Sequence, residues 1–287
     1  MHRSNPWGST WVSALGDGRY SGAIAPAWNL AMAPQGGVVA AIAARAMEAE
    51  LGTGQLLRSF HGVFAAPVSV GPVEVEANVI RTGRSMSQVR AEVRSAGADS
   101  GLVALAAFGH ERPGFGYTDL AMPVVPPPHE CVSYRDPPPP ESGMPDGPRF
   151  AFWTDVLEGR PALGHAPWDP SERGAAEVAT WFRFEHPPAD EQGSFDRLAL
   201  LVAADMMPSA VFEKVGTSEN GWFAPSVDLT VHLVDVPTGD WILNHNRAHY
   251  AGDGYASAEC ALWDAEAPGG PRLVAWATQI MFFTRFD

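Results

Sequence analysis

The chain contains an internal duplication, and this feature constrains its fold more than any other. Residues 102–109 (LVALAAFG) match residues 273–280 (LVAWATQI) at four of eight positions. A glycine, Gly83 or Gly254, precedes each block by the same 19 residues. Similar segments at a fixed offset are the signature of repeated structural units. The 287 residues therefore predict two copies of one unit in a single chain.

A proline-rich segment separates the two copies. Prolines are concentrated at residues 126–128 and 137–140, in a stretch without sustained apolar periodicity. Repeated prolines favour an extended, semi-rigid connection. We therefore predict a first unit over residues 1–122, a linker over 123–148 and a second unit over 149–287.

Hydrophobic periodicity predicts the same elements in both units. Apolar residues at helical spacing predict a helix over residues 36–51, and from residue 73 the apolar period changes to two, as in a strand. The second unit has a helical pattern near residues 196–207. Its predicted strands are residues 227–234, 241–250, 255–263 and 273–283. A helix followed by long strands at hairpin spacing predicts an α+β fold, in which an antiparallel sheet wraps around its own helix.

Charge and composition exclude several classes of function. The chain has 19 basic and 33 acidic residues, a net charge of −14, which disfavours nucleic acid and anionic membranes as partners. Its two cysteines, Cys131 and Cys260, are too few for a disulfide framework or a cysteine-rich metal site. We expect a cytoplasmic protein with no membrane span, no metal and no resident cofactor. Serine-hydrolase, P-loop and dinucleotide motifs are absent from the sequence.

Several segments, in their order and spacing, resemble the acyl-CoA thioesterase II family. The matching segments are residues 35–39 (QGGVV), 58–64 (RSFHGVF), 80–85 (IRTGRS), 227–232 (VDLTVH), 239–243 (GDWIL) and 273–279 (LVAWATQ). The resemblance implies a double hotdog fold, in which two units that each wrap a sheet around a helix are joined in one chain. It also implies hydrolysis of fatty acyl-CoA to free acid and CoA, with CoA present only as part of the substrate. A homodimer is a further expectation, because hotdog units usually pair through sheet edges.

The resemblance also suggests catalytic residues. The family holds a water with an Asp, a Thr or Ser, and a Gln from the second unit, which implies Asp228 and Gln279 here. The third residue does not carry over, because its segment, residues 244–254, contains no Ser or Thr. His249 within that segment is one substitute. Thr230, on the same predicted strand face as Asp228, is another.

Three further residues are candidates for the site. Gly36 and Gly37 begin the first predicted helix, where the family uses backbone amides to polarise the thioester carbonyl. His61 lies in a Ser-Phe-His segment that matches the family, although a structural histidine is the common alternative. Phe108 occupies the first-unit position equivalent to Gln279, so the fold does not itself require an amide there.

Two alternative functions stay open at this point. A non-catalytic protein that binds acyl groups or acyl-CoA would explain the missing Thr or Ser. A hotdog hydratase or dehydratase would need a histidine with an acidic partner, and the sequence has no Asp-x-Asn-Pro-type segment with a downstream histidine.

Overall fold

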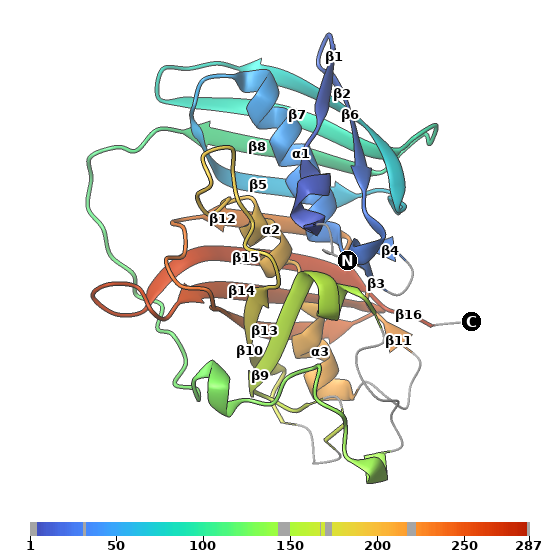
Figure 1. Ribbon diagram of the computed structural model, residues 1–287, viewed down its shortest axis with the longest axis vertical. Coiled ribbons are helices and arrows are strands. Elements are labelled where there is room, and N and C mark those ends of the chain that lie inside the picture. Colours follow the sequence, from blue (N-terminus) through green and yellow to red (C-terminus); the bar gives the residue numbers. More distant parts are fainter. Residues whose placement is uncertain are drawn as a thin grey trace.

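The computed structural model describes residues 5–30, 33–142, 150–166, 168–169, 174–216 and 222–285. Within these ranges, twelve strands form one antiparallel sheet (Figure 1). The first unit contributes β1 (Ser13–Gly16), β2 (Arg19–Ile24), β5 (Leu56–Phe64), β6 (Gly71–Arg81), β7 (Met86–Ser95) and β8 (Leu102–Gly109). The second contributes β9 (Leu157–Leu163), β10 (Glu177–Phe184), β12 (Asp228–Leu233), β13 (Ile242–Gly252), β14 (Tyr255–Asp264) and β15 (Arg272–Phe282).

The order of the strands confirms the duplication. The sheet runs β1-β2-β6-β7-β8-β5-β12-β15-β14-β13-β10-β9, so the two units repeat the same order outward from its centre. β5 and β12 form the central pair, with Val63 opposite Asp228 and Ser59 opposite His232. The repeated blocks of the sequence are β8 and the corresponding part of β15. This is the predicted double hotdog arrangement.

The predicted order of elements within each unit was wrong in one respect. Strands β1 and β2 precede the helix of the first unit, and β9 and β10 precede the helices of the second. In β10, residues 178–182 are buried in succession, so the strand lacks the alternation that identifies a half-exposed strand. β9 contains Gly159 and Pro161, which weaken its strand pattern further.

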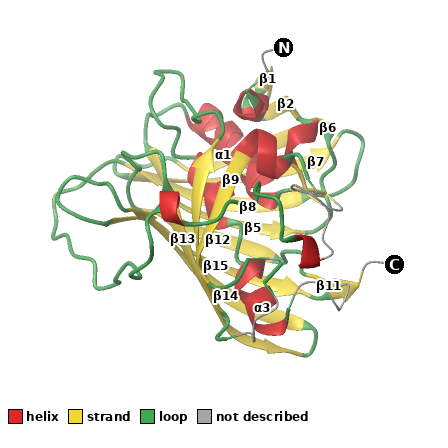
Figure 2. Ribbon diagram, turned by 60° about the horizontal axis from the view of Figure 1, so that its bottom comes forward, coloured by secondary structure: helices red, strands yellow, loops and turns green. Residues whose placement is uncertain are grey.

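In the part of the chain that the structure describes, three α-helices pack on one face of the sheet, here called its inner face (Figure 2). α1 (Gly36–Leu51) contacts β6 and β7 and ends at Gly52, whose φ of 60° is the left-handed conformation common at helix ends. The helix predicted near residues 196–207 forms but is interrupted: α2 (Ala199–Ala204) ends before α3 (Pro208–Val215). Pro208 starts a new helix because its ring and missing N–H do not allow an uninterrupted one. α2 packs against α1.

Shorter elements complete the fold. Two small pairs of strands are β3 (Asn29–Leu30) with β4 (Ala33–Pro34) and β11 (Trp222–Phe223) with β16 (Thr284–Arg285). Short 3-10 segments span Pro6–Thr10, Pro26–Trp28, Pro128–Glu130 and Pro140–Ser142, and a π-helical turn spans Phe152–Val156. No helix in the described ranges is both long and apolar enough to cross a membrane.

The connection between the units covers the outer face of the second one. Part of the predicted linker, residues 143–149, lies outside the described residues. Met122 and Val125 pack on a second hydrophobic cluster that includes Trp181 and Trp263, and the Trp181 indole donates a 2.9 Å hydrogen bond to the Pro126 carbonyl. These contacts fasten the connection to the sheet.

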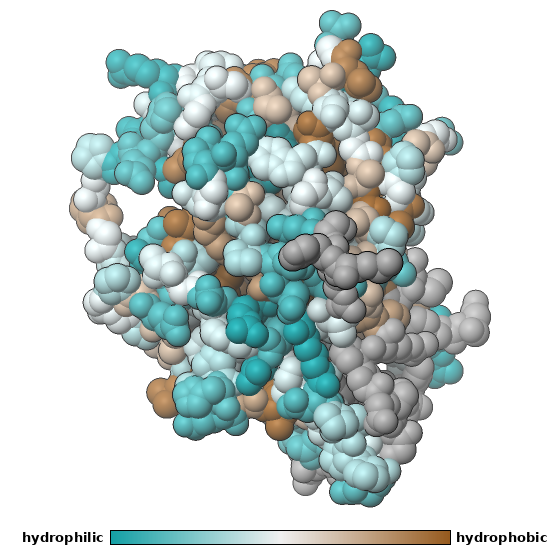
Figure 3. Space-filling model, viewed as in Figure 1, coloured by the Kyte–Doolittle hydropathy of each residue, from teal (hydrophilic) through white to brown (hydrophobic). Residues whose placement is uncertain are grey.

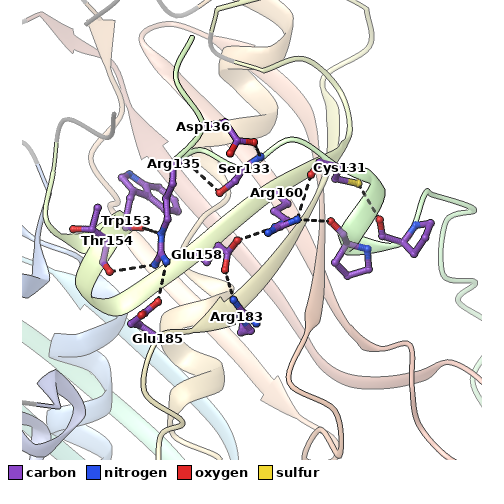
Figure 4. A network of polar contacts seen from close by, with 12 residues as sticks. Cys131, Ser133, Arg135, Asp136, Trp153, Thr154, Glu158, Arg160, Arg183 and Glu185 are labelled. Atoms are coloured by element: carbon purple, nitrogen blue, oxygen red, sulfur yellow. Dashed lines mark hydrogen bonds and ion pairs between the residues drawn. The ribbon is translucent and has the colours of Figure 1, made fainter. Parts of the chain in front are cut away.

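Polar contacts fix the end of this connection (Figure 4). Arg135 Nε donates to the Trp153 carbonyl at 2.8 Å, and its Nη1 lies 2.8 Å from Glu185 Oε2. Arg160 bridges the buried Glu158 and the Pro128 carbonyl. The earlier part of the connection arches away from the body, and an opening is visible beneath it (Figure 3).

Candidate active site

The break between α2 and α3 places Asp205 between the two units. Its carboxylate is buried and faces the first turn of α1. Asp205 Oδ2 accepts a 2.8 Å hydrogen bond from the Gly37 amide. A residue from the second unit is thus bound directly to the backbone of the first.

Two more polar side chains meet this carboxylate. Gln279 lies on the inner face of β15, and its Nε2 donates to Asp205 Oδ1 at 2.6 Å and to Ser226 Oγ at 2.7 Å. Ser226, just before β12, lies with its Oγ 3.3 Å from Asp205 Oδ1. Gln279 Oε1 is buried and has no hydrogen-bond partner in the described part of the chain. Asp205, Ser226 and Gln279 therefore form one polar cluster with an acceptor left open.

Burial has the largest effect on the pKa of the Asp205 carboxyl group. Removal from water raises the pKa of Asp205 to about 6, although hydrogen bonds from Gln279 and Gly37 oppose that increase. A carboxyl group with this pKa changes protonation close to neutral pH, and perturbed groups of this kind are concentrated at functional sites.

Both glycines of α1 lie in close packing, which is against side chains at Gly36 and against backbone at Gly37. A Cβ on Gly36 would lie 2.8 Å from Asp205 Oδ2 and 2.8 Å from the Phe64 ring. A Cβ on Gly37 would lie 2.4 Å from the Leu201 carbonyl oxygen. Their expected role toward a thioester carbonyl stays a prediction, and here the Gly37 N–H is bound to Asp205.

The structure does not bring Asp228 and Gln279 together as expected. Asp228 points to the outer face of the sheet, where its Oδ1 accepts a 2.7 Å hydrogen bond from the Ile280 amide. Side chains alternate along a strand, so the residue next to Ile280, Gln279, points to the opposite face. Asp228 therefore lies at the start of β12 away from Gln279, and the carboxylate that Gln279 contacts is Asp205.

The other candidates also lie away from this cluster. His61 Nδ1 and Thr230 Oγ1 are 2.7 Å apart on the outer face, where they join β5 to β12. His249 is exposed, and its Nε2 lies 3.1 Å from Glu259 Oε1. In the described part of the chain, none of these three residues is bound to Gln279.

Sequence reasoning missed Asp205 and Ser226, although each left a signal. Asp205 is the one acidic residue in the apolar run of residues 198–207 (LALLVAADMM). Ser226 is two residues before Asp228 and lies outside residues 244–254, the segment in which the resemblance placed the Ser or Thr. Within the described ranges, no group of three His, Cys, Asp or Glu side chains has an arrangement that suits a metal ion.

Comparisons with known proteins agree with this fold. The N-terminal domain model of acyl-CoA thioesterases matches residues 24–109, and the C-terminal domain model matches residues 128–283. The fold defines a double hotdog protein of the thioesterase type. The chain belongs to the acyl-CoA thioesterase family, as the sequence motifs predicted. No curated protein matches it.

Solved structures share the fold at low sequence identity. A hot dog fold protein of unknown function from Alicyclobacillus acidocaldarius has a TM-score of 0.78 and 23% identity, with 97% of each chain covered. The tesB protein MAP1729c of Mycobacterium avium subs. paratuberculosis has a TM-score of 0.72 and 18% identity, with 96% of this chain and 97% of that chain covered. The acyl-CoA thioesterase II TesB2 from Mycobacterium marinum has a TM-score of 0.70 and 20% identity, with 98% of each covered.

Proposed function

We propose that the chain hydrolyses acyl-CoA thioesters with a water held by Asp205, Ser226 and Gln279. The observation that carries this proposal is the contact of these three side chains at the start of α1, with the buried Gln279 Oε1 left as an open acceptor. The residue types are the Asp, the Thr or Ser, and the Gln that the family resemblance implies. Their position between the two units, beside the start of α1, supports placing the substrate carbonyl there in this proposal.

In this proposal Asp205 acts as the general base. One hydrogen of the water binds Gln279 Oε1, and the other passes to Asp205 as the water oxygen bonds to the thioester carbon. The tetrahedral intermediate then expels the CoA sulfur, which takes the electron pair of the C–S bond and the proton from Asp205. The products are a free acid and CoA, and no covalent enzyme intermediate forms. A positioned base of this kind typically contributes about 10²- to 10⁴-fold in rate.

The surroundings of the cluster suit an acyl group. Phe64 and Met206 are half-buried and pack against the hydrophobic core. Phe64 lies beside Gly36, and Met206 lies beside Gln35, so both are close to the start of α1. They offer apolar contact beside the polar cluster. A fatty acyl chain is the substrate class that this combination favours.

Thiol release from a panel of acyl-CoA substrates tests the proposal. Asp205→Asn keeps the shape of the side chain and removes the base, so we expect kcat to fall at least about 100-fold. Asp228→Asn is the matched control, because the same change on the outer face should leave kcat within about twofold. Full activity in Asp205→Asn, or loss of activity confined to Asp228→Asn, would overturn the assignment.

The same experiment separates the two alternatives. In the proposed cluster, Ser226 takes the position of the Thr or Ser whose absence favoured a binding protein. Tight acyl-CoA binding by calorimetry without thiol release would nevertheless favour that alternative. Consumption of 2-enoyl-CoA without thiol release would favour a hydratase.

A further inference from the structure

The break between α2 and α3 leaves backbone carbonyls that a continuous helix would have bonded internally. Buried side-chain amides donate hydrogen bonds to these carbonyls instead. Asn244 Nδ2 donates to the Ala203 carbonyl at 2.6 Å, and Asn246 Nδ2 donates to the Met206 carbonyl at 3.2 Å. Both come from β13, below the helices. The break is therefore held in one conformation by specific hydrogen bonds.

Gln35 supplies the third amide, and it comes from the other unit. Its Nε2 donates to the Val202 and Asp205 carbonyls, each at 3.0 Å. Its Oε1 accepts a 3.1 Å hydrogen bond from the Val38 amide and so caps α1. The side chain is 3% exposed. One glutamine thus fixes both the start of α1 and the backbone of Asp205.

The cap alone does not explain a glutamine at this position. Ser, Thr, Asp and Asn are the usual residues before a helix, because their shorter side chains bring an oxygen back to the first amides. A hydroxyl or carboxylate cap would satisfy the Val38 N–H but would not donate to two carbonyls of the facing helix. The Nε2 amino group of Gln35 is therefore the part of the side chain that binds the second unit.

We infer that Gln35 is a positioning residue, which sets the Asp205 carboxylate for catalysis by holding its backbone from across the boundary between the units. This inference rests on the proposed function of Asp205. Gln35 binds the Asp205 main chain, and in the described contacts the carboxylate itself is bound by Gly37, Ser226 and Gln279. If the Gln35 donor is lost, we expect the carboxylate to lose alignment with these donors.

Gln35→Glu keeps the acceptor for Val38 and removes the donor, but its own charge also raises the pKa of Asp205, so the neutral Gln35→Met is the deciding variant. Gln35→Met removes both polar groups at similar size and avoids the buried charge of Gln35→Glu. Gln55 gives the matched control: it is also buried, at 6% exposed, and its Nε2 donates to the Gly83 carbonyl at 2.9 Å. Gln55→Glu and Gln55→Met therefore remove the same kind of donor from a backbone carbonyl, that of Gly83, which has no described contact with Asp205.

Two measurements apply to each variant: the pH profile of kcat, and the titration of the Asp205 carboxyl carbon by NMR, assigned by its disappearance in Asp205→Asn. Weaker hydrogen bonds to a carboxylate raise its pKa, so both midpoints should increase by about one pH unit in the Gln35 variants and stay in place in the Gln55 variants. An unchanged Asp205 titration in folded Gln35→Met protein would overturn the inference. If the wild type releases no thiol, the proposed function fails, and the NMR titration still tests whether Gln35 positions Asp205.

Discussion

The Gly37 amide of the first unit donates a 2.8 Å hydrogen bond to the Asp205 carboxylate of the second. The two residues are far apart in the sequence and belong to different copies of the repeat. Glycine is needed at position 37 because the facing helix approaches so closely that a Cβ would lie 2.6 Å from Val202 Cα. The candidate site is thus a property of the joined units.

Gly37→Ala should damage both stability and activity. The added methyl group overlaps the backbone of α2, so we expect a loss of about 3 kcal/mol in the free energy of unfolding and a large loss of thiol release. Denaturant titration and the thioesterase assay measure these effects. Gly114→Ala is the control, since a Cβ there has open space. Wild-type stability in Gly37→Ala would contradict the tight approach of the helices.

The titration of Asp205 predicts opposite effects of pH on activity and stability. Activity should rise with pH through about 6, because the base must be deprotonated. The pKa of Asp205 in the folded protein, about 6, lies above its ordinary value of 3.8. Between these two pH values the folded protein therefore binds this proton more strongly than the unfolded chain does. This carboxyl's contribution to stability is therefore fully present below about pH 3.8 and is lost as pH rises through about 6.

Comparison with Asp205→Asn isolates this effect. Asparagine does not titrate, so the variant does not lose this stability as pH rises. Relative to the wild type, its free energy of unfolding should therefore increase with pH, by up to about 3 kcal/mol. Denaturant titrations from pH 4 to pH 8 measure it. A difference between the two proteins that does not change with pH would show that Asp205 titrates like an exposed carboxyl.

A buried ion pair at the other end of the helix pair should matter for stability. Arg45 of α1 binds Asp196, which lies just before α2, and both side chains are almost fully buried. Asp196→Asn removes the carboxylate that binds the buried Arg45 guanidinium, so we expect a loss of about 3 to 5 kcal/mol by denaturant titration. Glu92→Gln breaks the more exposed Arg90–Glu92 pair and should cost at most about 1 kcal/mol. Equal losses in the two variants would contradict the burial argument.

The sequence predicted the fold well because the fold depends on repetition and periodicity. The blocks at β8 and β15, the helix at residues 36–51 and the later strands all carry such a signal. β10 was missed because both of its faces are covered, one by the core and one by residues such as Val125. An apolar run without alternation gives no indication of its period.

The site was harder to predict because its residues meet only through tertiary contacts. Gln279 stood out in the sequence because Phe108 takes its place in the other unit, and its side chain contacts Asp205 and Ser226, while its catalytic role stays a prediction. Asp228 was selected by position in a motif, but the direction of a side chain depends on strand register. Ser226 and Asp228 are two residues apart, a spacing that a regular strand would keep on one face. Ser226, however, precedes β12 and its Oγ lies near Asp205, whereas Asp228 begins β12 and accepts from the Ile280 amide on the outer face.

The central pairing of β5 with β12 has a consequence for how the site assembles. A single unit would leave one long strand edge open, and it would have to close that edge with a separate molecule. Covalent fusion makes this step intramolecular, so it depends on the length and stiffness of the connection and no longer on protein concentration. Dilution, which would separate two independent units, leaves Gly37 and Asp205 within reach of each other.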